Sequence, residues 1–248
     1  MPRLCANISL LFTERPFLDR VAAARAAGFQ GVEAQFPYED PAPRLLDRLD
    51  AAGLPLVLLN CPPPNYAGGP RGWAASPGGE ERFRNDFRRS ARLAATLGAR
   101  HVHVMAGEAE GEDARRTFVE NLRWAAAAAP QQRLTIEPLN PADAPGCFLD
   151  GFDLAAAVLD EVAAPTLGLQ FDVHHARLLE GCAHRAWARH GHRATHVQVA
   201  GQVAGQGRHE PDDPSFLQRL DREGYAGWVG AEYVPRGRTE DGLGWMRG

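Results

Sequence analysis

The chain has 248 residues, of which 44% are hydrophobic, and it carries a formal net charge of −4. This length fits either two average domains or one (β/α)8 barrel, which runs to about 250 residues. The charge and the lack of a dense Lys/Arg run do not indicate a nucleic-acid partner, and no apolar run approaches the roughly 20 residues of a membrane-spanning helix. The first residues, MPRLCANISLLFTERPF, are interrupted too soon for a signal peptide, so we expect a cytoplasmic protein.

Short apolar runs alternate with longer helical patterns along the chain. Strands are predicted, in order, at Leu4–Leu10, Gly31–Ala34, Leu56–Leu59, His101–Met105, Arg133–Glu137, Thr166–Phe171, Ala194–Val199 and Gly227–Glu232. Helices are predicted at Phe17–Ala27, Pro43–Ala52, Glu80–Leu97, Asp113–Ala129, Gly151–Glu161, His184–His190 and Pro214–Glu223, with a last helical turn after Thr239. Eight strands, each followed by helical material, predict an α/β fold of the (β/α)8 TIM barrel type.

The main alternative is a doubly wound open sheet. That fold is expected to carry a glycine-rich phosphate-binding turn after its first strand, but LLFTERPF, at the end of the first predicted strand, contains no glycine. No Ser-rich linker or shift in composition divides the chain. We therefore predict a single barrel domain over residues 1–248, with Gly28, Gly53 and Gly98 ending helices.

A long segment rich in proline and glycine, residues 62–79, follows the third predicted strand. Active sites of barrel enzymes are built from the loops at the carboxyl ends of the strands. We therefore expect this segment to be a loop that covers substrate or a mobile insertion.

The cysteines do not form a recognisable metal or redox motif. Cys5, Cys61, Cys147 and Cys182 are scattered, and none lies in a CxxC spacing. We expect reduced thiols that pack as small apolar residues.

Four polar residues end four of the predicted strands: Glu137 in LTIEP, Asp172 in GLQFD, Gln198 in THVQVA and Glu232 in WVGAEY. Consecutive members lie about 26 to 35 positions apart, roughly one βα unit. A carboxylate or carboxamide at the end of a buried strand is costly unless something offsets it. Four in register suggest one shared site, most simply a hard cation such as Mg²⁺ or Mn²⁺ held by oxygen ligands. Zinc is disfavoured because neither Cys nor His occupies these positions.

Histidines near this set are further candidates. His174 and His175 follow Asp172, in what we expect to be a turn, and adjacent side chains usually point apart. We favour His175 as the one that faces the site, where it can orient a substrate hydroxyl or carry a proton. His101 and His103 alternate on one strand and share one face, and we expect both to be structural.

Charged residues in two loops are also candidates for binding substrate. Arg208 and Glu210 follow the seventh predicted strand, and Arg71 lies in the long loop. Arginine suits a bidentate grip on a carboxylate. The alternative for each is a solvated loop charge.

Several segments resemble hydroxypyruvate isomerase and 2-oxo-tetronate isomerase, a family within the xylose isomerase-like barrels. The resemblance spans nearly the whole chain. The segments that carry it are ANISLLF from Ala6, GFQGVEAQFPY from Gly28, NCPPPNYAGGPRG from Asn60, TFVENLRWAA from Thr117, IEPLN from Ile136, QFDVHH from Gln170, HVQVAG from His196, RHEP from Arg208, YAGWVGAEYVP from Tyr225 and GLGWM from Gly242.

The resemblance implies a residue-by-residue assignment of roles. It places a divalent metal on Glu137, Asp172, Gln198 and Glu232 and makes Glu137 and Glu232 the acid/base pair. It implies substrate contacts for His175 and Arg208. We add Arg71, Glu210 and Asn60 as further candidates for contact with substrate. The reaction implied is an aldose–ketose type isomerisation of a small hydroxy-oxo acid, hydroxypyruvate to tartronate semialdehyde or a 2-oxo-tetronate, through an enediolate.

Alternatives stay open within and beyond this family. A sugar 3-epimerase of the same superfamily needs the same metal and two acids, although a His is more typical at the position of Gln198. A DNA-repair endonuclease resembles the chain more weakly and needs several zinc ions. A small-ligand-binding barrel without turnover is the non-enzyme alternative, because Pro141, Gly201 and Val234 depart from the family pattern near the pocket. The sequence leaves the oligomeric state open, including a homo-oligomer.

Overall fold

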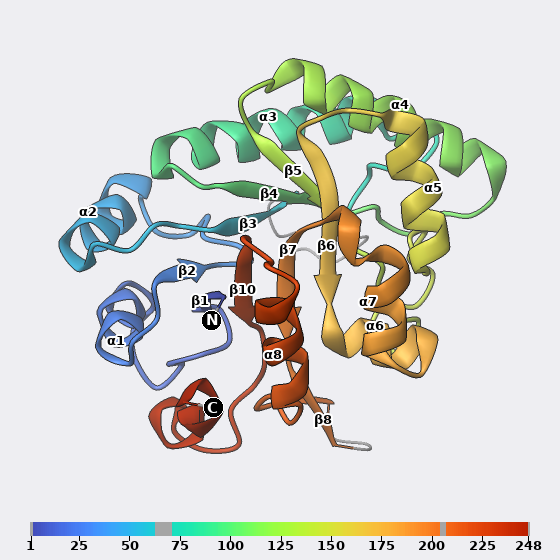
Figure 1. Ribbon diagram of the computed structural model, residues 1–248. Helices are drawn as coiled ribbons and strands as arrows, with labels where there is room; N and C mark the ends of the chain where they lie inside the picture. Colours follow the sequence, from blue (N-terminus) through green and yellow to red (C-terminus); the bar gives the residue numbers. More distant parts are fainter. Residues whose placement is uncertain (1, 63–70, 204–206, 248) are drawn as a thin grey trace.

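The computed structural model describes residues 2–62, 71–203 and 207–247, and its central feature is an eight-stranded parallel sheet (Figure 1). The strands lie in the order β2-β1-β10-β7-β6-β5-β4-β3. They are β1 Arg3–Asn7, β2 Gly31–Glu33, β3 Leu58–Cys61, β4 His101–Val104, β5 Arg133–Ile136, β6 Leu167–Asp172, β7 Ala194–Val199 and β10 Trp228–Ala231. All the predicted strands are confirmed, and the predicted barrel is the fold of the protein.

The two edge strands of this sheet meet and nearly close the barrel. Val32 in β2 pairs with Leu56, just before β3, in a parallel bridge. Backbone bonds continue this contact, from Ala34 N to the Leu58 carbonyl oxygen at 3.0 Å and from Asn60 N to the Gln35 carbonyl oxygen at 2.9 Å. Closure leaves few unpaired backbone groups at the sheet edge, and it brings the residues after β2 and β3 to the same rim.

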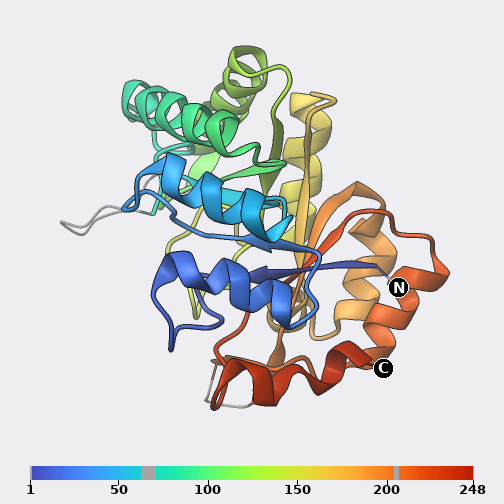
Figure 2. The ribbon, with the colours of Figure 1, turned by 90° about the vertical axis from the view of Figure 1, so that its left-hand side faces the viewer.

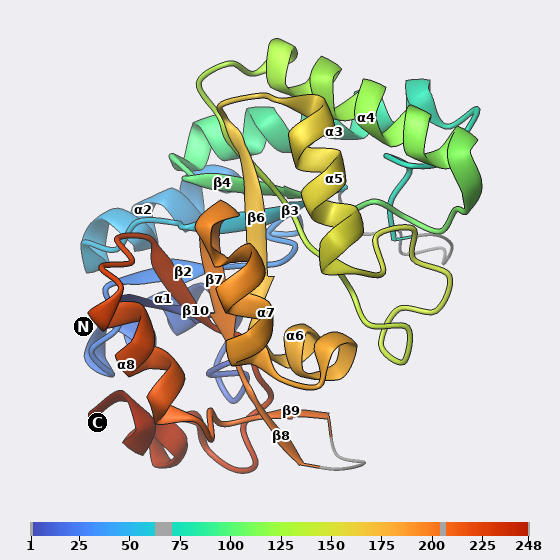
Figure 3. The same cartoon turned by 45° about the vertical axis from the view of Figure 1, so that its right-hand side comes forward.

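Helices surround the sheet. They are α1 Arg20–Ala26, α2 Ala42–Ala52, α3 Glu80–Leu97, α4 Gly111–Ala128, α5 Phe152–Val162, α6 Val173–Glu180, α7 Ala183–His190 and α8 Pro214–Arg222, with 3₁₀ helices at Phe17–Asp19, Gly191–Arg193 and Thr239–Arg247. Figure 2 shows α1, α2 and α3 side by side on the outside of the sheet, and Figure 3 shows α5 and α7 over β6 and β7. No helix among the described residues is long and apolar enough to cross a membrane.

The side chains of β6 point alternately to the core outside the barrel and to its interior, and this alternation shows how the core positions the site. Phe171 points outward and packs with Phe152 and Trp187, with ring centroids 5.1 Å away in each case. Burying each such aromatic side chain contributes about 1.5–3 kcal/mol. Because successive side chains of a strand point to opposite faces, the same packing turns Gln170 and Asp172 toward the barrel interior, where both are buried.

Two elements were not predicted. Helix α6 begins directly after Asp172, so the expected turn at His174 and His175 is wrong, and both lie in the first turn of a helix. A two-stranded antiparallel hairpin, β8 Gly201–Val203 with β9 Gly207–His209, occupies the loop after β7. At its base, a Cβ on Gly201 would collide with the carbonyl oxygen of Glu210, which explains a glycine there.

Other local predictions can be checked directly. Gly53 and Gly98 cap α2 and α3 in the left-handed region, with φ of 62° and 63°, as expected. The four cysteines are free thiols, and Cys5 and Cys61 are buried. Residues 63–70 of the long loop, which we expected to cover substrate, lie outside the described residues.

Candidate active site

A cavity of about 370 Å³ opens at the carboxyl ends of the strands. Its lining comes from seven of the eight barrel strands or the segments that follow them, and from the hairpin: Leu10, Gln35, Asn60, Arg71, His103, Met105, Glu137, Leu139, Asp143, Ala144, Gln170, His175, Gly207, Arg208, Glu232 and Val234. Six of the residues predicted from the sequence are among them. This end of the barrel is where barrel enzymes carry their active sites.

Three carboxylates and one guanidinium form the centre of the site. Arg208 Nη1 donates to Asp172 Oδ2 at 2.8 Å and lies 3.6 Å from Glu232 Oε1. The other oxygen of Asp172 accepts a bond from the backbone N–H of His175 and caps the N-terminus of α6. Asp172 is therefore held at both oxygens. Glu137 and Glu232 are also buried, at 7% and 8% exposure.

The charges of this cluster are coupled. Burial raises the pKa of Glu137 well above its usual range, and the charges of Asp172 and Glu232 raise it further. Burial likewise raises the pKa of Glu232, to about 7, against the lowering effect of Arg208. Burial would also raise the pKa of Asp172, but Arg208, His174, His175 and the backbone N–H of His175 together keep that pKa below its ordinary value. The single guanidinium of Arg208 thus does not neutralise the three carboxyl groups. Because of this excess negative charge, binding of a further cation at the cluster is favourable.

The residues present fit such a cation. Glu137 Oε1 is buried and has no hydrogen-bond partner in the part of the chain that the structure describes. Ligand atoms of Glu137, Asp172 and His175 all lie within 4.8 Å of one another. An unpartnered buried carboxylate oxygen is costly, and oxygen-rich groups of this kind suit hard divalent ions.

His175 faces the cavity, as the sequence suggested, while His174 turns away and bonds Asp143 at 2.8 Å. Burial lowers the pKa of His175 to about 4, so it is neutral at pH 7. Its Nδ1 lies 3.1 Å from the backbone N–H of Asn140, and its Nε2 lies 2.6 Å from Arg208 Nη2. A neutral imidazole accepts at only one nitrogen. In one of these two contacts, therefore, two hydrogen-bond donors face each other.

Gln198 does not line the cavity directly. Its Oε1 accepts a bond of 2.8 Å from Gln170 Nε2, which also donates to Glu137 Oε2 at 3.0 Å. Gln170 was missed in the sequence, although the signal was present. It stands two positions before Asp172 on one strand and therefore faces the same side.

Other residues of the site were also missed or undervalued. Gln35, in the segment VEAQFPY, donates from Nε2 to Glu232 Oε1 at 2.9 Å. His103, expected to be only structural, lines the cavity and lies 3.6 Å from Glu137 Oε2 and 3.3 Å from Asn60 Oδ1. Burial lowers the pKa of His103 to about 3. Its partner in the pattern, His101, lies deeper and packs on His196.

The predicted loop residues separate into two groups. Arg71 lines the cavity from the end of the long loop. Glu210, predicted to contact substrate, does not line it and instead accepts a bond of 3.0 Å from the backbone N–H of Arg236. Glu210 is therefore not among the predicted residues that the fold brings together at the cavity. Val234, a departure from the family pattern, is at the cavity and is 53% exposed.

Comparisons with known proteins agree with this geometry. The sequence model of the family described as xylose isomerase-like TIM barrel matches residues 21–248. A 2-oxo-tetronate isomerase from Cupriavidus necator is 43% identical over 258 residues, covering 100% of this chain and 98% of that protein. A hydroxypyruvate isomerase from Escherichia coli is 35% identical over 254 residues, covering 99% and 98%.

A solved structure supports the same placement. The structure described as AP endonuclease, family 2, from Brucella melitensis has a TM-score of 0.93 and 38% identity, covering 100% of this chain and 98% of that chain. The similarity thus extends over the whole barrel and not only over the site. The chain belongs to the xylose isomerase-like TIM barrel family, together with relatives named 2-oxo-tetronate isomerase and hydroxypyruvate isomerase.

Proposed function

We propose that this chain is a metal-dependent isomerase of the aldose–ketose type that acts on a small hydroxy-oxo acid, such as hydroxypyruvate or a 2-oxo-tetronate. The names of its relatives support this substrate class. The observation that carries the proposal is the pair Glu137 and Glu232, two buried carboxyl groups with raised pKa values that line one cavity. Paired carboxyl groups of this kind suit proton transfer near neutral pH.

In this proposal Mg²⁺ or Mn²⁺ is held by the oxygen atoms of Glu137, Asp172, Gln198 and Glu232. The unpartnered Oε1 of Glu137 supports this ligand set. When bound, the cation would polarise the substrate carbonyl and acidify the adjacent C–H. Asp172 and Gln198 would serve mainly to position it.

Glu137 and Glu232 move the proton between two adjacent carbons. The ionised carboxylate of one removes the proton from the hydroxyl-bearing carbon and leaves an enediolate. A carboxyl group then delivers a proton to the former carbonyl carbon, while the hydroxyl proton passes to the former carbonyl oxygen. In the metal-free protein the pKa of Glu232 is raised to about 7, close to the pH at which it would exchange a proton. Proton transfer by positioned groups contributes about 10²–10⁴-fold to rate.

The carboxylate of the substrate is recognised by donors at the rim. Arg208 Nη2 and His175 Nε2 lie 2.6 Å apart. When His175 Nδ1 accepts from the backbone N–H of Asn140, both of these nitrogens are donors and neither can accept from the other. An oxygen that enters this space accepts from both and relieves the conflict of donors. Arg71 and Asn60, which also line the cavity, supply further positive charge and hydrogen bonding for an acid of three or four carbons.

A substrate panel tests the proposal. Three- and four-carbon hydroxy-oxo acids are incubated with the protein and Mg²⁺ or Mn²⁺, and the products are followed by NMR. We expect an isomer to form from one acid, and we expect both chelation of the metal and the variant Glu137→Gln to prevent it. Unchanged spectra for every acid with either metal would contradict the isomerase proposal.

A further inference from the structure

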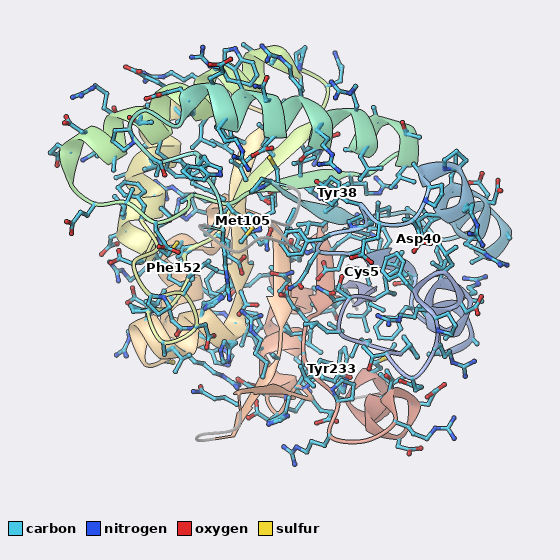
Figure 4. All side chains as sticks on the ribbon, turned by 180° about the vertical axis from the view of Figure 1, so that it is seen from behind. Cys5, Tyr38, Asp40, Met105, Phe152 and Tyr233 are labelled. Carbon is cyan, nitrogen blue, oxygen red and sulfur yellow. The ribbon has the colours of Figure 1, made fainter. Side chains whose placement is uncertain are left out.

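Glu33, the last residue of β2, is fully buried inside the barrel and takes no part in the proton transfer described above. Its carboxylate accepts four contacts. Asn7 Nδ2 and Gln198 Nε2 bond Oε1 at 3.1 and 2.9 Å, while His196 Nε2 and Cys5 Sγ approach Oε2 at 2.7 and 3.7 Å. Cys5, labelled in Figure 4, marks this cluster among the strands. Burial raises the pKa of the Cys5 thiol, which therefore donates as S–H.

Hydrogen bonds donated in one direction connect the site to this cluster. The hydroxyl of Thr135 donates to Gln170 Oε1 at 2.9 Å, and Gln170 Nε2 donates to Gln198 Oε1 at 2.8 Å. Gln198 Nε2 in turn donates to Glu33. An ionised carboxylate only accepts, whereas an amide can be turned over to exchange its donor and acceptor ends. The carboxylate of Glu33 therefore fixes the orientation of the Gln198 amide at this end of the series, while Gln170 is also held by its bond to Glu137.

Turning the amide of Gln198 over would break this series at both ends. Its oxygen would face the carboxylate of Glu33, and its NH₂ would face the NH₂ of Gln170. Buried polar groups that meet without a hydrogen bond are strongly disfavoured. The oxygen of Gln198 is thus held on the side of Gln170, toward Glu137.

The fold makes room for this carboxylate. Gly230 in β10 stands in register with Gln198 and with Cys5. A Cβ at Gly230 would lie 2.5 Å from Glu33 Oε2 and 2.6 Å from Oε1. A glycine inside a strand often marks the close approach of another group, and here that group is the side chain of Glu33.

We propose that Glu33 is a positioning residue that orients the side-chain amide of Gln198, so that its oxygen faces the carboxylates of the site. The inference deepens the proposed function, in which that oxygen is a metal ligand, and rests on it for its consequence. Glu33 acts through Gln198, without itself lining the cavity. Partners of this kind commonly change metal affinity when they are removed.

The first test needs no metal. In protein labelled with ¹⁵N-glutamine, the side-chain NH₂ of Gln198 is assigned by its loss in Gln198→Leu, and its hydrogen exchange is measured. We expect slow exchange in the wild type and fast exchange in Glu33→Met, which removes the acceptor. Glu33→Gln keeps one oxygen for Asn7 and Gln198 and can turn its NH₂ toward His196, whose Nε2 accepts in the other neutral tautomer, so we expect it to restore slow exchange. Equal exchange in the wild type and Glu33→Met would overturn the proposal.

The second test measures the consequence, as the dissociation constant of Mn²⁺ from equilibrium dialysis. We expect Glu33→Met to weaken binding about 10- to 100-fold and Glu33→Gln to recover most of that loss, with the exposed Glu81→Met as a control. Equal losses in Glu33→Gln and Glu33→Met would mean that the charge of Glu33 matters, and would overturn the positioning role.

Gly230→Ala gives an independent variant in case Glu33→Met does not fold. Its added Cβ displaces the carboxylate of Glu33 without removing a polar group, so we expect faster exchange of the Gln198 amide and weaker Mn²⁺ binding. A folded Gly230→Ala protein with unchanged amide exchange and Mn²⁺ affinity would count against the proposal. If the wild type binds no Mn²⁺, the proposed metal site fails, and the exchange of the amide still decides the role of Glu33.

Discussion

Gln35 and Glu232 lie 197 positions apart in the chain, yet Gln35 Nε2 donates a bond of 2.9 Å to Glu232 Oε1. Gln35 follows β2 and Glu232 follows β10, and β1 lies between these two strands in the sheet. The bond stabilises the ionised form of Glu232 and lowers its pKa, against burial, which raises it to about 7. Gln35 thus lowers the pKa of one member of the proposed acid/base pair.

Replacing Gln35 by Met removes this donor and leaves the burial of Glu232 in place. We expect the pKa of Glu232 to rise in the metal-free protein, because the ionised form loses a hydrogen bond while the neutral form does not. Carboxyl ¹³C NMR of protein labelled at glutamate measures the titration, with the exposed Gln218→Met as the matched control. A pKa that stays constant or falls in Gln35→Met would contradict this role.

Glu137→Gln separates catalysis from stability. We expect turnover to fall about 10²–10⁴-fold, because a carboxamide cannot exchange the proton. We expect the melting temperature of the metal-free variant to rise, by about 2–4 °C for each ~1 kcal/mol of relieved repulsion. Glu210→Gln, outside the cavity, is the control for both measurements. Turnover close to that of the wild type would remove Glu137 from the acid/base pair.

The pH dependence of stability in the metal-free protein follows from the shifted groups. Glu232 has a folded pKa of about 7, above its unfolded value, so the folded state binds more protons and loses stability as the pH rises through that pKa. The buried His175, His103 and His101, with pKa values of about 4, 3 and 3, act in the opposite direction, and their effect fades as the unfolded imidazoles lose their protons around pH 6.5.

We therefore expect the free energy of unfolding of the metal-free protein to fall between about pH 7 and 8, where the unfolded histidines are mostly neutral. Urea titrations at several pH values, with and without chelator, measure it. Saturating Mg²⁺ or Mn²⁺ is expected to flatten the fall, because a bound cation favours the ionised carboxylates. A stability that rises with pH across this window would contradict the assignment of a raised pKa to Glu232.

Arg208→Met removes the positive charge that faces Asp172. We expect the metal-free variant to lose about 3–5 kcal/mol, as when one partner of a buried ion pair is deleted. We also expect Mg²⁺ to restore part of that stability, because the cation supplies positive charge to the same carboxylates. Arg115→Met, which breaks an exposed pair with Glu161, is expected to cost less than about 1 kcal/mol. Equal losses in the two variants would contradict the picture of a buried charge cluster.

The barrel and most of its rim could be predicted because both depend on local patterns. The apolar runs predicted all eight strands of the barrel, and acids at the ends of parallel strands must meet at one rim. Helix α6 was missed because no loop separates it from β6, and Asp172, interpreted only as a ligand, also caps that helix. The hairpin β8–β9 was missed because its strands are three residues each, too short to show alternation.

The hydrogen bonds made by Gln170 and Glu33 could not be predicted from one strand at a time. Their partners lie on other strands, at Thr135, Glu137 and Gln198, and only closure of the barrel brings them together. The position of Glu210 away from the cavity lining could not be predicted, because a charged loop residue gives no indication of which way its side chain points. The choice of Mg²⁺ or Mn²⁺, the single domain over 1–248, the cytoplasmic location and the oligomeric state stay predictions.

Solvent deuterium exchange tests the central claim most directly. Hydroxypyruvate and the 2-oxo-tetronates are each incubated in D₂O with the wild type and Mg²⁺ or Mn²⁺, and carbon-bound deuterium is followed by NMR. We expect deuterium at the carbon next to the carbonyl of at least one acid, isomer formation from that acid, and loss of both in Glu232→Gln. If the metal-loaded wild type exchanges no carbon-bound hydrogen in any of these acids, the account of Glu137 and Glu232 as an acid/base pair for hydroxy-oxo acids is contradicted.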